Sequence, residues 1–163
     1  MDELFEMFPD SSFNIDPKAD DSVEVLADAI EAHGAIDRVC VGAFSDDRVN
    51  RMRERLGPSL CTSPGPKKTV ALLTAAVGPA PLARRLEDHG HGSVQIPPGK
   101  GPLKLTANMV TGLHDLGLEV HVWTINDEPT MTSLLDMGVD GVMTDDVELL
   151  KSVMNERDQW RDQ

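Results

Sequence analysis

The chain has 163 residues, of which 40% are hydrophobic and 26% charged. This length fits one domain over residues 1–163, and the composition is typical of a globular protein. Its formal net charge of −13 repels phosphate backbones, so nucleic acid is excluded as an expected partner. The longest apolar run, residues 70–83, is interrupted by glycine and proline, and no transmembrane segment is expected. Because the first residues are acidic rather than basic, the chain as given is predicted to be cytoplasmic, and an export signal upstream of it stays an open alternative.

The predicted elements alternate between short β-rich runs and longer helical runs. A short helix over residues 2–8 precedes a strand over 12–15, and apolar residues recur at helical spacing from residue 21 until Gly34. Further strands are predicted at 38–44, 59–62, 93–96, 120–125 and 141–144. Further helices are predicted at 46–56, 67–77, 81–89, 106–116 and 128–137, and from residue 145 or 146 to about 157.

An internal repeat marks the last quarter of the chain. Residues 115–119 (DLGLE) recur as residues 136–140 (DMGVD), and in each copy a glycine ends a helix before the next strand begins. Asp145 and Glu148 are expected to cap the last helix. Six strands in 163 residues (163/6, about 27 per unit) predict a repeating βα fold with parallel strands. Length alone favours an open sheet, because a complete (β/α)₈ barrel needs about 250 residues.

The two cysteines, Cys40 and Cys61, lie in apolar contexts and lack the spacing of a metal site. Free, buried thiols are therefore expected, and a disulfide between them is the less favoured alternative. Neither thiol is predicted to take part in chemistry.

The most specific pattern in the chain is formed by VHVWTIND at 120–127 and LDMGVDGVMTD at 135–145. Upstream, FPDSSFNIDPK at 8–18 is similar to a carboxylate-x-Lys strand, VGAFSD at 41–46 to a Ser-Phe strand end, and VQIP at 94–97 to a Gln-x-Pro strand. Together and in this order, the segments resemble the glycerophosphodiester phosphodiesterase family along essentially the whole chain.

The resemblance implies an α/β fold that is an incomplete (β/α)₈ TIM-type barrel, whose six βα units correspond to barrel strands three to eight. It also implies metal-dependent hydrolysis of a small-molecule glycerophosphodiester to an alcohol and glycerol 3-phosphate, in lipid metabolism, with Ca²⁺ or Mg²⁺. In the family, a His-Arg-Gly, a Glu-x-Asp and a His-Asp supply the acid and base histidines and two of three metal carboxylates. The chain does not match these elements, so it is expected to be truncated and inactive alone, and no catalytic residue is assigned.

Three residues match the family's site by position. The resemblance implies that Asp16 is the third metal carboxylate, that Lys18 neutralises the substrate phosphate, and that Trp123 lines the glycerol pocket. The structural alternatives are that Asp16 and Lys18 are turn residues beside Pro17, and that Trp123 is a core residue. A single carboxylate is not expected to bind a metal ion tightly.

None of the histidines is a convincing substitute for the missing acid and base. His89 and His91 lie in the glycine-rich segment DHGHG, which predicts a solvated loop. His33 and His114 fall on predicted helices, and surface positions are expected for them. His121 shares a strand face with Trp123 and is expected to be a hydrogen-bonded core residue.

Two functions from different classes are compatible with these residues. In the first, the chain is the C-terminal two thirds of a glycerophosphodiester phosphodiesterase, and the activity belongs to a longer product. In the second, it is a non-catalytic βα-repeat protein that binds a phosphorylated ligand or a second chain. An incomplete barrel leaves two strand edges unpaired, so association through these open edges is expected.

Overall fold

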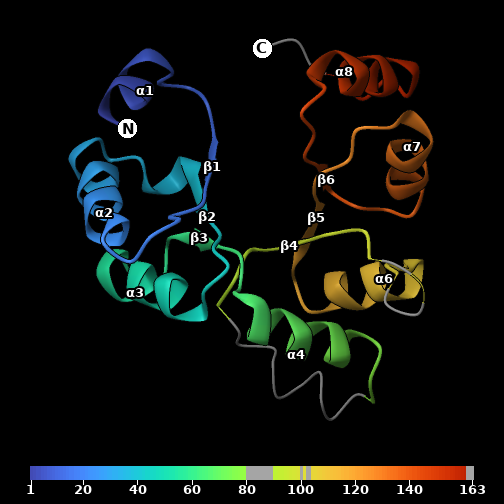
Figure 1. Ribbon diagram of the computed structural model, residues 1–163, viewed down its shortest axis with the longest axis horizontal. Helices are drawn as coiled ribbons and strands as arrows, with labels where there is room; N and C mark the ends of the chain where they lie inside the picture. The colour runs from blue at the N-terminus through green and yellow to red at the C-terminus, as the bar shows by residue number, and fades with distance from the viewer. Residues whose placement is uncertain (80–89, 100, 102–103, 161–163) are drawn as a thin grey trace.

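Strands and helices alternate along the chain as predicted (Figure 1). The computed structural model describes residues 1–79, 90–99, 101 and 104–160, and the helix predicted at 81–89 lies outside these residues. In order, the elements are α1 (Asp2–Met7), β1 (Phe13–Ile15), α2 (Ser22–Ala32), the 3₁₀ helix η1 (Ile36–Arg38), β2 (Val39–Val41), α3 (Asp46–Leu56), β3 (Cys61–Thr62), α4 (Pro66–Ala76), β4 (Ser93–Ile96), α6 (Ala107–Asp115), β5 (Glu119–Val122), α7 (Glu128–Asp136), β6 (Gly141–Val142) and α8 (Val147–Glu156). No helix among them is long and apolar enough to cross a lipid bilayer.

All six predicted strands are present, but most are shorter than expected. The segment 38–44, predicted as one strand, begins with the last residue of η1 and then contains β2, which has three residues. The strand predicted at 120–125 ends at Val122. At the carboxyl ends, residues such as Phe44 and Trp123 have left the sheet and line a cavity. Residues of types that favour strands therefore continue for two or three positions after the last residue that is paired in the sheet.

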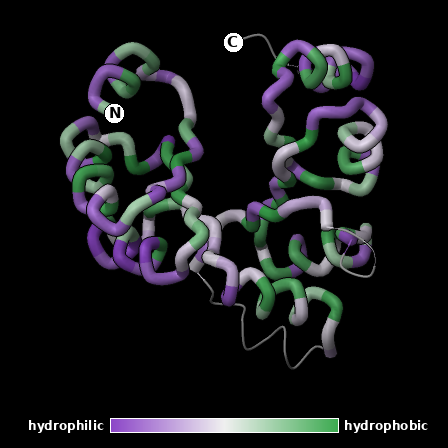
Figure 2. Tube along the Cα trace, viewed as in Figure 1, coloured by the Kyte–Doolittle hydropathy of each residue, from purple (hydrophilic) through white to green (hydrophobic). Residues whose placement is uncertain are grey.

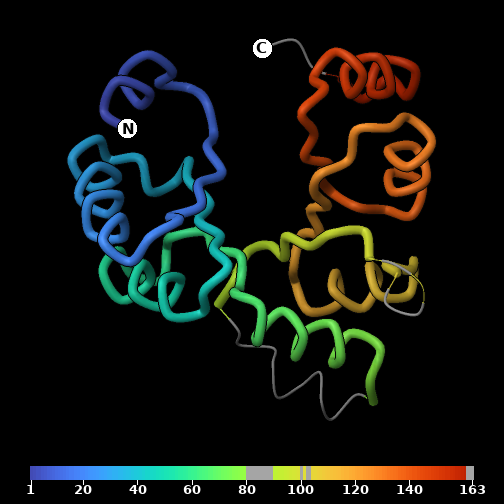
Figure 3. The backbone as a smooth tube through the Cα atoms, in the orientation of Figure 1, coloured from blue at the N-terminus to red at the C-terminus, as the bar shows by residue number. Residues whose placement is uncertain are grey.

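The strands form two parallel sheets of three strands each, in the orders β1-β2-β3 and β4-β5-β6. Backbone and side-chain hydrogen bonds join β3 to the start of β4: the amide of Gly92 donates to the carbonyl oxygen of Thr62 at 3.1 Å, and the amide of Gln95 donates to Ser63 Oγ at 3.0 Å. The strands follow the inner side of one arc and the described helices its outer side, with β1 and β6 on opposite sides of the opening (Figures 1 and 3). This is an α/β, incomplete (β/α)₈ barrel rather than an open doubly wound sheet.

Two hydrophobic clusters lie between the strands and the helices. The N-terminal cluster includes Phe5, Ile30, Val41 and Met52. Because side chains alternate along a strand, the valines at 39 and 41 enter this cluster while residue 40 between them faces the inside of the arc.

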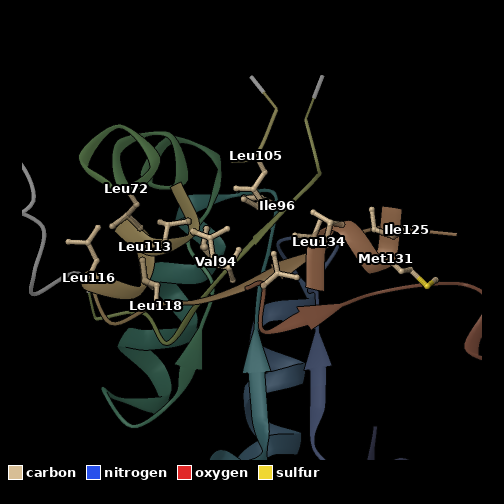
Figure 4. Close-up of a cluster of buried hydrophobic side chains, with 14 of the residues drawn as sticks. Leu72, Val94, Ile96, Leu105, Leu113, Leu116, Leu118, Ile125, Met131 and Leu134 are labelled. Atoms are coloured by element: carbon tan, nitrogen blue, oxygen red, sulfur yellow. The ribbon is translucent and has the colours of Figure 1, made fainter. Parts of the chain in front are cut away.

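The second cluster joins the C-terminal sheet to α4, α6 and α7, and Figure 4 shows its side chains converging from these elements. Val94, Leu113 and Val120 are fully buried in it, together with Leu72 and Met131. Figure 2 shows a matching contrast in hydropathy, since α3 is mainly hydrophilic whereas α4 and α6 carry more hydrophobic residues.

Arginines of α3 pair with carboxylates on α2 and the loop before it. The ladder consists of Arg48–Asp20 at 3.1 Å, Arg51–Glu24 at 3.1 Å, Arg55–Asp28 at 2.9 Å and Arg55–Glu31 at 2.5 Å. These contacts set positive charge beside the acidic helix α2, and they neutralise part of the chain's excess of carboxylates.

The internal repeat predicts the local structure correctly. Gly117 and Gly138 have φ angles of 77° and 93°, in the left-handed region that favours glycine, and each follows a helix and precedes a strand. The predicted cap of the last helix is one residue off. Asp146, rather than Asp145, accepts a hydrogen bond from the amide of Leu149 at 3.0 Å, because Asn126 binds both the backbone amide and the carboxylate of Asp145.

Candidate active site

The carboxyl ends of all six strands meet at one cavity of about 820 Å³. In parallel βα folds this end of the strands is where loops gather and where ligands bind. One lining residue after each strand, from β1 to β6, is Asp16, Phe44, Ser63, Pro97, Trp123 and Met143. The cavity therefore joins segments that are far apart in the sequence.

All three predicted site residues line this cavity. Asp16 and Lys18 lie in the loop after β1, not on the strand itself, because β1 ends at Ile15 and Pro17 is buried between them. Lys18 Nζ is 2.5 Å from Asp16 Oδ2, and the lysine side chain is 79% exposed. The other carboxylate oxygen, Asp16 Oδ1, is buried and accepts no hydrogen bond within the described part of the chain.

Trp123 lines the same cavity as the β1 loop and lies half-buried, directly after β5. Its ring makes an edge-to-face contact with Phe44, with ring centroids 5.5 Å apart and an angle of 75° between the planes. Phe44 is 67% exposed, which is unusual for a large aromatic side chain with an apolar neighbour. Sequence reasoning did not select Phe44, although its place in the matched VGAFSD segment is the signal that could have found it.

Asn14 of β1 and Gln95 of β4 line the cavity closer to the sheets, and sequence reasoning did not select them either. Gln95 Nε2 donates to Asn14 Oδ1 at 2.8 Å, and Asn14 Nδ2 donates to Gln95 Oε1 at 3.3 Å. This reciprocal amide pair joins the two sheets across the inside of the arc. Ser63 Oγ accepts a hydrogen bond from the backbone amide of Gln95 and so holds the backbone of β4 at this residue.

The residues present do not make a complete metal site. Asp16 Oδ1 offers one available carboxylate oxygen, which fits a single ligand position. Ca²⁺ takes about six to eight oxygen ligands and Mg²⁺ about six. Within residues 1–79, 90–99, 101 and 104–160, no three His, Cys, Asp or Glu side chains form a group that could hold an ion.

The four histidines within the described ranges are not among the described residues that line the cavity. The prediction for His91 is wrong: it is only 6% exposed, and its Nδ1 lies 2.8 Å from Thr62 Oγ1. Backbone pairing between Gly92 and Thr62 holds this segment against β3, because glycine allows the close approach. His121 is half-buried, 3.4 Å from Glu119, and His114 lies 2.8 Å from Asp140.

Comparison with known proteins connects this arrangement of strands and cavity to a family. The model of the glycerophosphoryl diester phosphodiesterase family matches residues 3–149. The chain belongs to this family. The match contains all six strands and every cavity residue discussed above.

A curated relative in Mycobacterium tuberculosis (strain ATCC 25618 / H37Rv), with the name "Probable glycerophosphodiester phosphodiesterase 2", is 35% identical over 162 residues. The alignment covers 98% of this chain and 61% of the relative. The chain therefore spans about three fifths of that relative's length.

Solved structures share the fold at lower identity. A Silicibacter pomeroyi DSS-3 protein assigned to the glycerophosphoryl diester phosphodiesterases has a TM-score of 0.76 and 18% identity, over 99% of this chain and 58% of that chain. An Oleispira antarctica phosphodiesterase, solved with the product sn-glycerol-3-phosphate, has a TM-score of 0.64 and 18% identity, over 88% of this chain and 55% of that chain. These similarities confirm the predicted incomplete barrel.

The Asn14–Gln95 pair should contribute measurably to stability. In a double-mutant cycle with Asn14→Ala and Gln95→Ala, followed by urea unfolding, the coupling free energy is expected to be about 0.5–1.5 kcal/mol, because two hydrogen bonds are lost together. Asn155→Ala on the exposed surface of α8 is the matched control, and its effect should add to that of Gln95→Ala within about 0.5 kcal/mol. A coupling between Asn14 and Gln95 no larger than this control would show that the pair does not hold the sheets together.

Proposed function

We propose that the chain supplies the substrate-binding part of a glycerophosphodiester phosphodiesterase, an enzyme that converts a glycerophosphodiester and water to an alcohol and glycerol 3-phosphate. The observation that supports this most directly is that Asp16, Lys18 and Trp123 line one cavity at the carboxyl ends of the strands, in a chain of this family. A charged end and an aromatic wall are what a ligand with a phosphate and a short carbon chain requires.

Lys18 is proposed to neutralise the phosphate. It is the one cationic side chain among the described residues that line the cavity, and the whole chain carries a formal charge of −13. A phosphate that enters this cavity therefore depends on a local positive charge. The ammonium group of Lys18 is exposed and is held at the rim by its ion pair with Asp16.

Trp123 is proposed to contact the carbon atoms of the glycerol group. Its contact with Phe44 produces a continuous aromatic wall in the cavity that the β1 loop also lines. Aromatic faces pack well against C–H groups and exclude water from the charged end of a bound ligand. Phe44 is assigned to the same wall.

Asp16 is proposed as one ligand of a divalent cation, Ca²⁺ or Mg²⁺, through its available oxygen Oδ1. Such an ion would neutralise a phosphate oxygen when bound. The described residues provide too few oxygen ligands to hold it alone, so the other ligands have to come from outside this set.

Glycerol 3-phosphate is expected to bind in this cavity and to change the fluorescence of Trp123. The measurement uses Trp160→Phe as the background, because the chain contains only two tryptophans. Lys18→Ala should weaken binding about tenfold or more, since a charge-assisted contact contributes about 1.5–3 kcal/mol. Lys151→Ala on α8 is the matched control and should leave the affinity unchanged. Equal affinities for the two variants would remove Lys18 from the site.

The pure 163-residue chain is expected not to release glycerol 3-phosphate from glycerophosphocholine with Ca²⁺ or Mg²⁺ present. Hydrolysis requires a general acid and base, and no described histidine reaches the cavity. Product release is measured with a coupled glycerol 3-phosphate assay, with the full-length Mycobacterium tuberculosis relative as the positive control. Cation-dependent release that Asp16→Asn abolishes would contradict the expectation.

A second candidate is a non-catalytic protein that associates with a partner chain. Within the described residues, β1 pairs only with β2 and β6 only with β5, so each leaves one edge available. A further cavity of about 770 Å³ lies beside β1 and α2, and the Val25 side chain that lines it is 71% exposed. Open strand edges and exposed apolar groups favour association.

Sedimentation velocity at increasing chain concentration tests this candidate. Association should appear as a rise in the sedimentation coefficient, and Val25→Glu should shift the rise to higher concentration because it places a charge in the contact. Val147→Glu on α8 is the control, since Val147 is similarly exposed, at 61%, and lies on another element. A monomer at every concentration would reject association through this surface.

A further inference from the structure

The two cysteines lie side by side on the inner face of the N-terminal sheet. Cys40 of β2 and Cys61 of β3 are register partners in a parallel pair, so their side chains project from the same face. Val41 and Thr62, the next pair, are buried on the opposite face. Both thiols are free and half-buried, rather than fully buried as the sequence predicted.

Polar neighbours surround the Cys40 thiol. Ser93 Oγ lies 3.5 Å from Cys40 Sγ, and the side-chain amide of Gln95 donates to the same sulfur at 3.8 Å. The hydrogen bond with Cys61 lowers the pKa of Cys40 to about 7, with a smaller contribution from Ser93, whereas burial and Glu119 act in the opposite direction. The pKa of Cys61 is raised, first by the hydrogen bond with Cys40 and then by burial. One thiol of the pair therefore ionises readily, and the other keeps its proton.

The spacing of the strands suits a bond between the two sulfur atoms. Neighbouring strands lie about 4.8 Å apart, within the range of about 4.4–6.8 Å between the Cα atoms of a disulfide. The Cβ atoms of a disulfide are closer, at about 3.8 Å, so β3 has to rotate slightly toward β2. Because β3 has only two residues and lies at the edge of its described sheet, this rotation disturbs few ladder contacts with β2, although it also shifts the hydrogen bond from the Gly92 amide to the Thr62 carbonyl oxygen.

We propose that Cys40 and Cys61 form a dithiol site that reacts with hydrogen peroxide and closes reversibly to a disulfide. Cys40 is the nucleophile because its thiolate forms more readily and is the reactive species. Cys61 is the resolving thiol, since it is the register partner of Cys40 and faces the same side of the sheet. This site does not depend on the proposed phosphodiesterase function.

The reaction has two balanced steps. The Cys40 thiolate attacks one peroxide oxygen, an S–O bond forms as the O–O bond breaks, and the departing hydroxide takes up a proton to become water. The Cys61 sulfur then attacks the sulfenic sulfur of Cys40, the S–S bond forms, and the S–O bond breaks with loss of a second water. Two thiols lose two electrons, and one peroxide is reduced to two waters.

Intact-mass measurement of the peroxide-treated chain tests the site. The wild-type chain is expected to lose the mass of two hydrogen atoms, a peptide map should link the peptides that contain Cys40 and Cys61, and dithiothreitol should restore both thiols. The assignment is unambiguous because the chain has only two cysteines. The rate of oxidation should rise with pH through about 7, where half of Cys40 is thiolate, and level off at least about one pH unit higher, as the thiolate becomes fully populated.

Single variants separate the two roles. Cys61→Ser should stop at a sulfenic acid on Cys40 that dimedone labels, whereas Cys40→Ser should remain unlabelled at the same peroxide dose. The wild-type measurement decides the outcome even where a variant fails to fold. Two free thiols after treatment, conversion of Cys40 to a sulfinic acid without a link to Cys61, or links only between separate chains would each overturn the proposal.

Discussion

The connection between the two three-stranded sheets is the constraint on which the rest of the structure depends. Strand pairing does not continue across β3 and β4. The sheets are joined instead by a few polar contacts, above all the reciprocal amide pair of Asn14 and Gln95 across the inside of the arc. A residue after every strand lines the cavity, so these contacts help to set how the strand ends are arranged around it. Asn14 is exposed and Gln95 half-buried, and the two hydrogen bonds between their side chains are directional.

The proposed function assigns ligand-binding groups to this cavity but no group for proton transfer. Lys18 and Trp123 come from loops after different strands and are brought to one cavity by the barrel, and Lys18 is also held by its ion pair with Asp16. The histidines are engaged elsewhere: His91 with Thr62, His114 with Asp140 and His121 with Glu119. Under the proposed function, the described residues therefore supply contacts for a ligand but no histidine for proton transfer.

The sequence predicts what local rules control. Glycines 117 and 138 mark helix ends, hydrophobic periodicity marks the helices, and β-rich runs mark all six strands. It does not predict strand lengths, because Phe44 and Trp123 have β-like composition although they lie beyond the ladder. It places Cys40 and Cys61 in separate strands, but their pairing depends on the register between β2 and β3, which no local pattern encodes. The prediction for His91 is wrong because a glycine-rich segment can form a tight tertiary contact as well as a solvated loop.

The arginine ladder between α2 and α3 gives the two halves of the arc different physical characters. The N-terminal helices α2 and α3 are linked by exposed ion pairs, which dissolved ions screen, in addition to the apolar cluster that contains Ile30 and Met52. The C-terminal helices are linked through a larger apolar cluster, which dissolved ions do not weaken in this way. High ionic strength is therefore expected to weaken the charged contacts between α2 and α3, whereas the apolar packing on both sides of the arc does not depend on such charges.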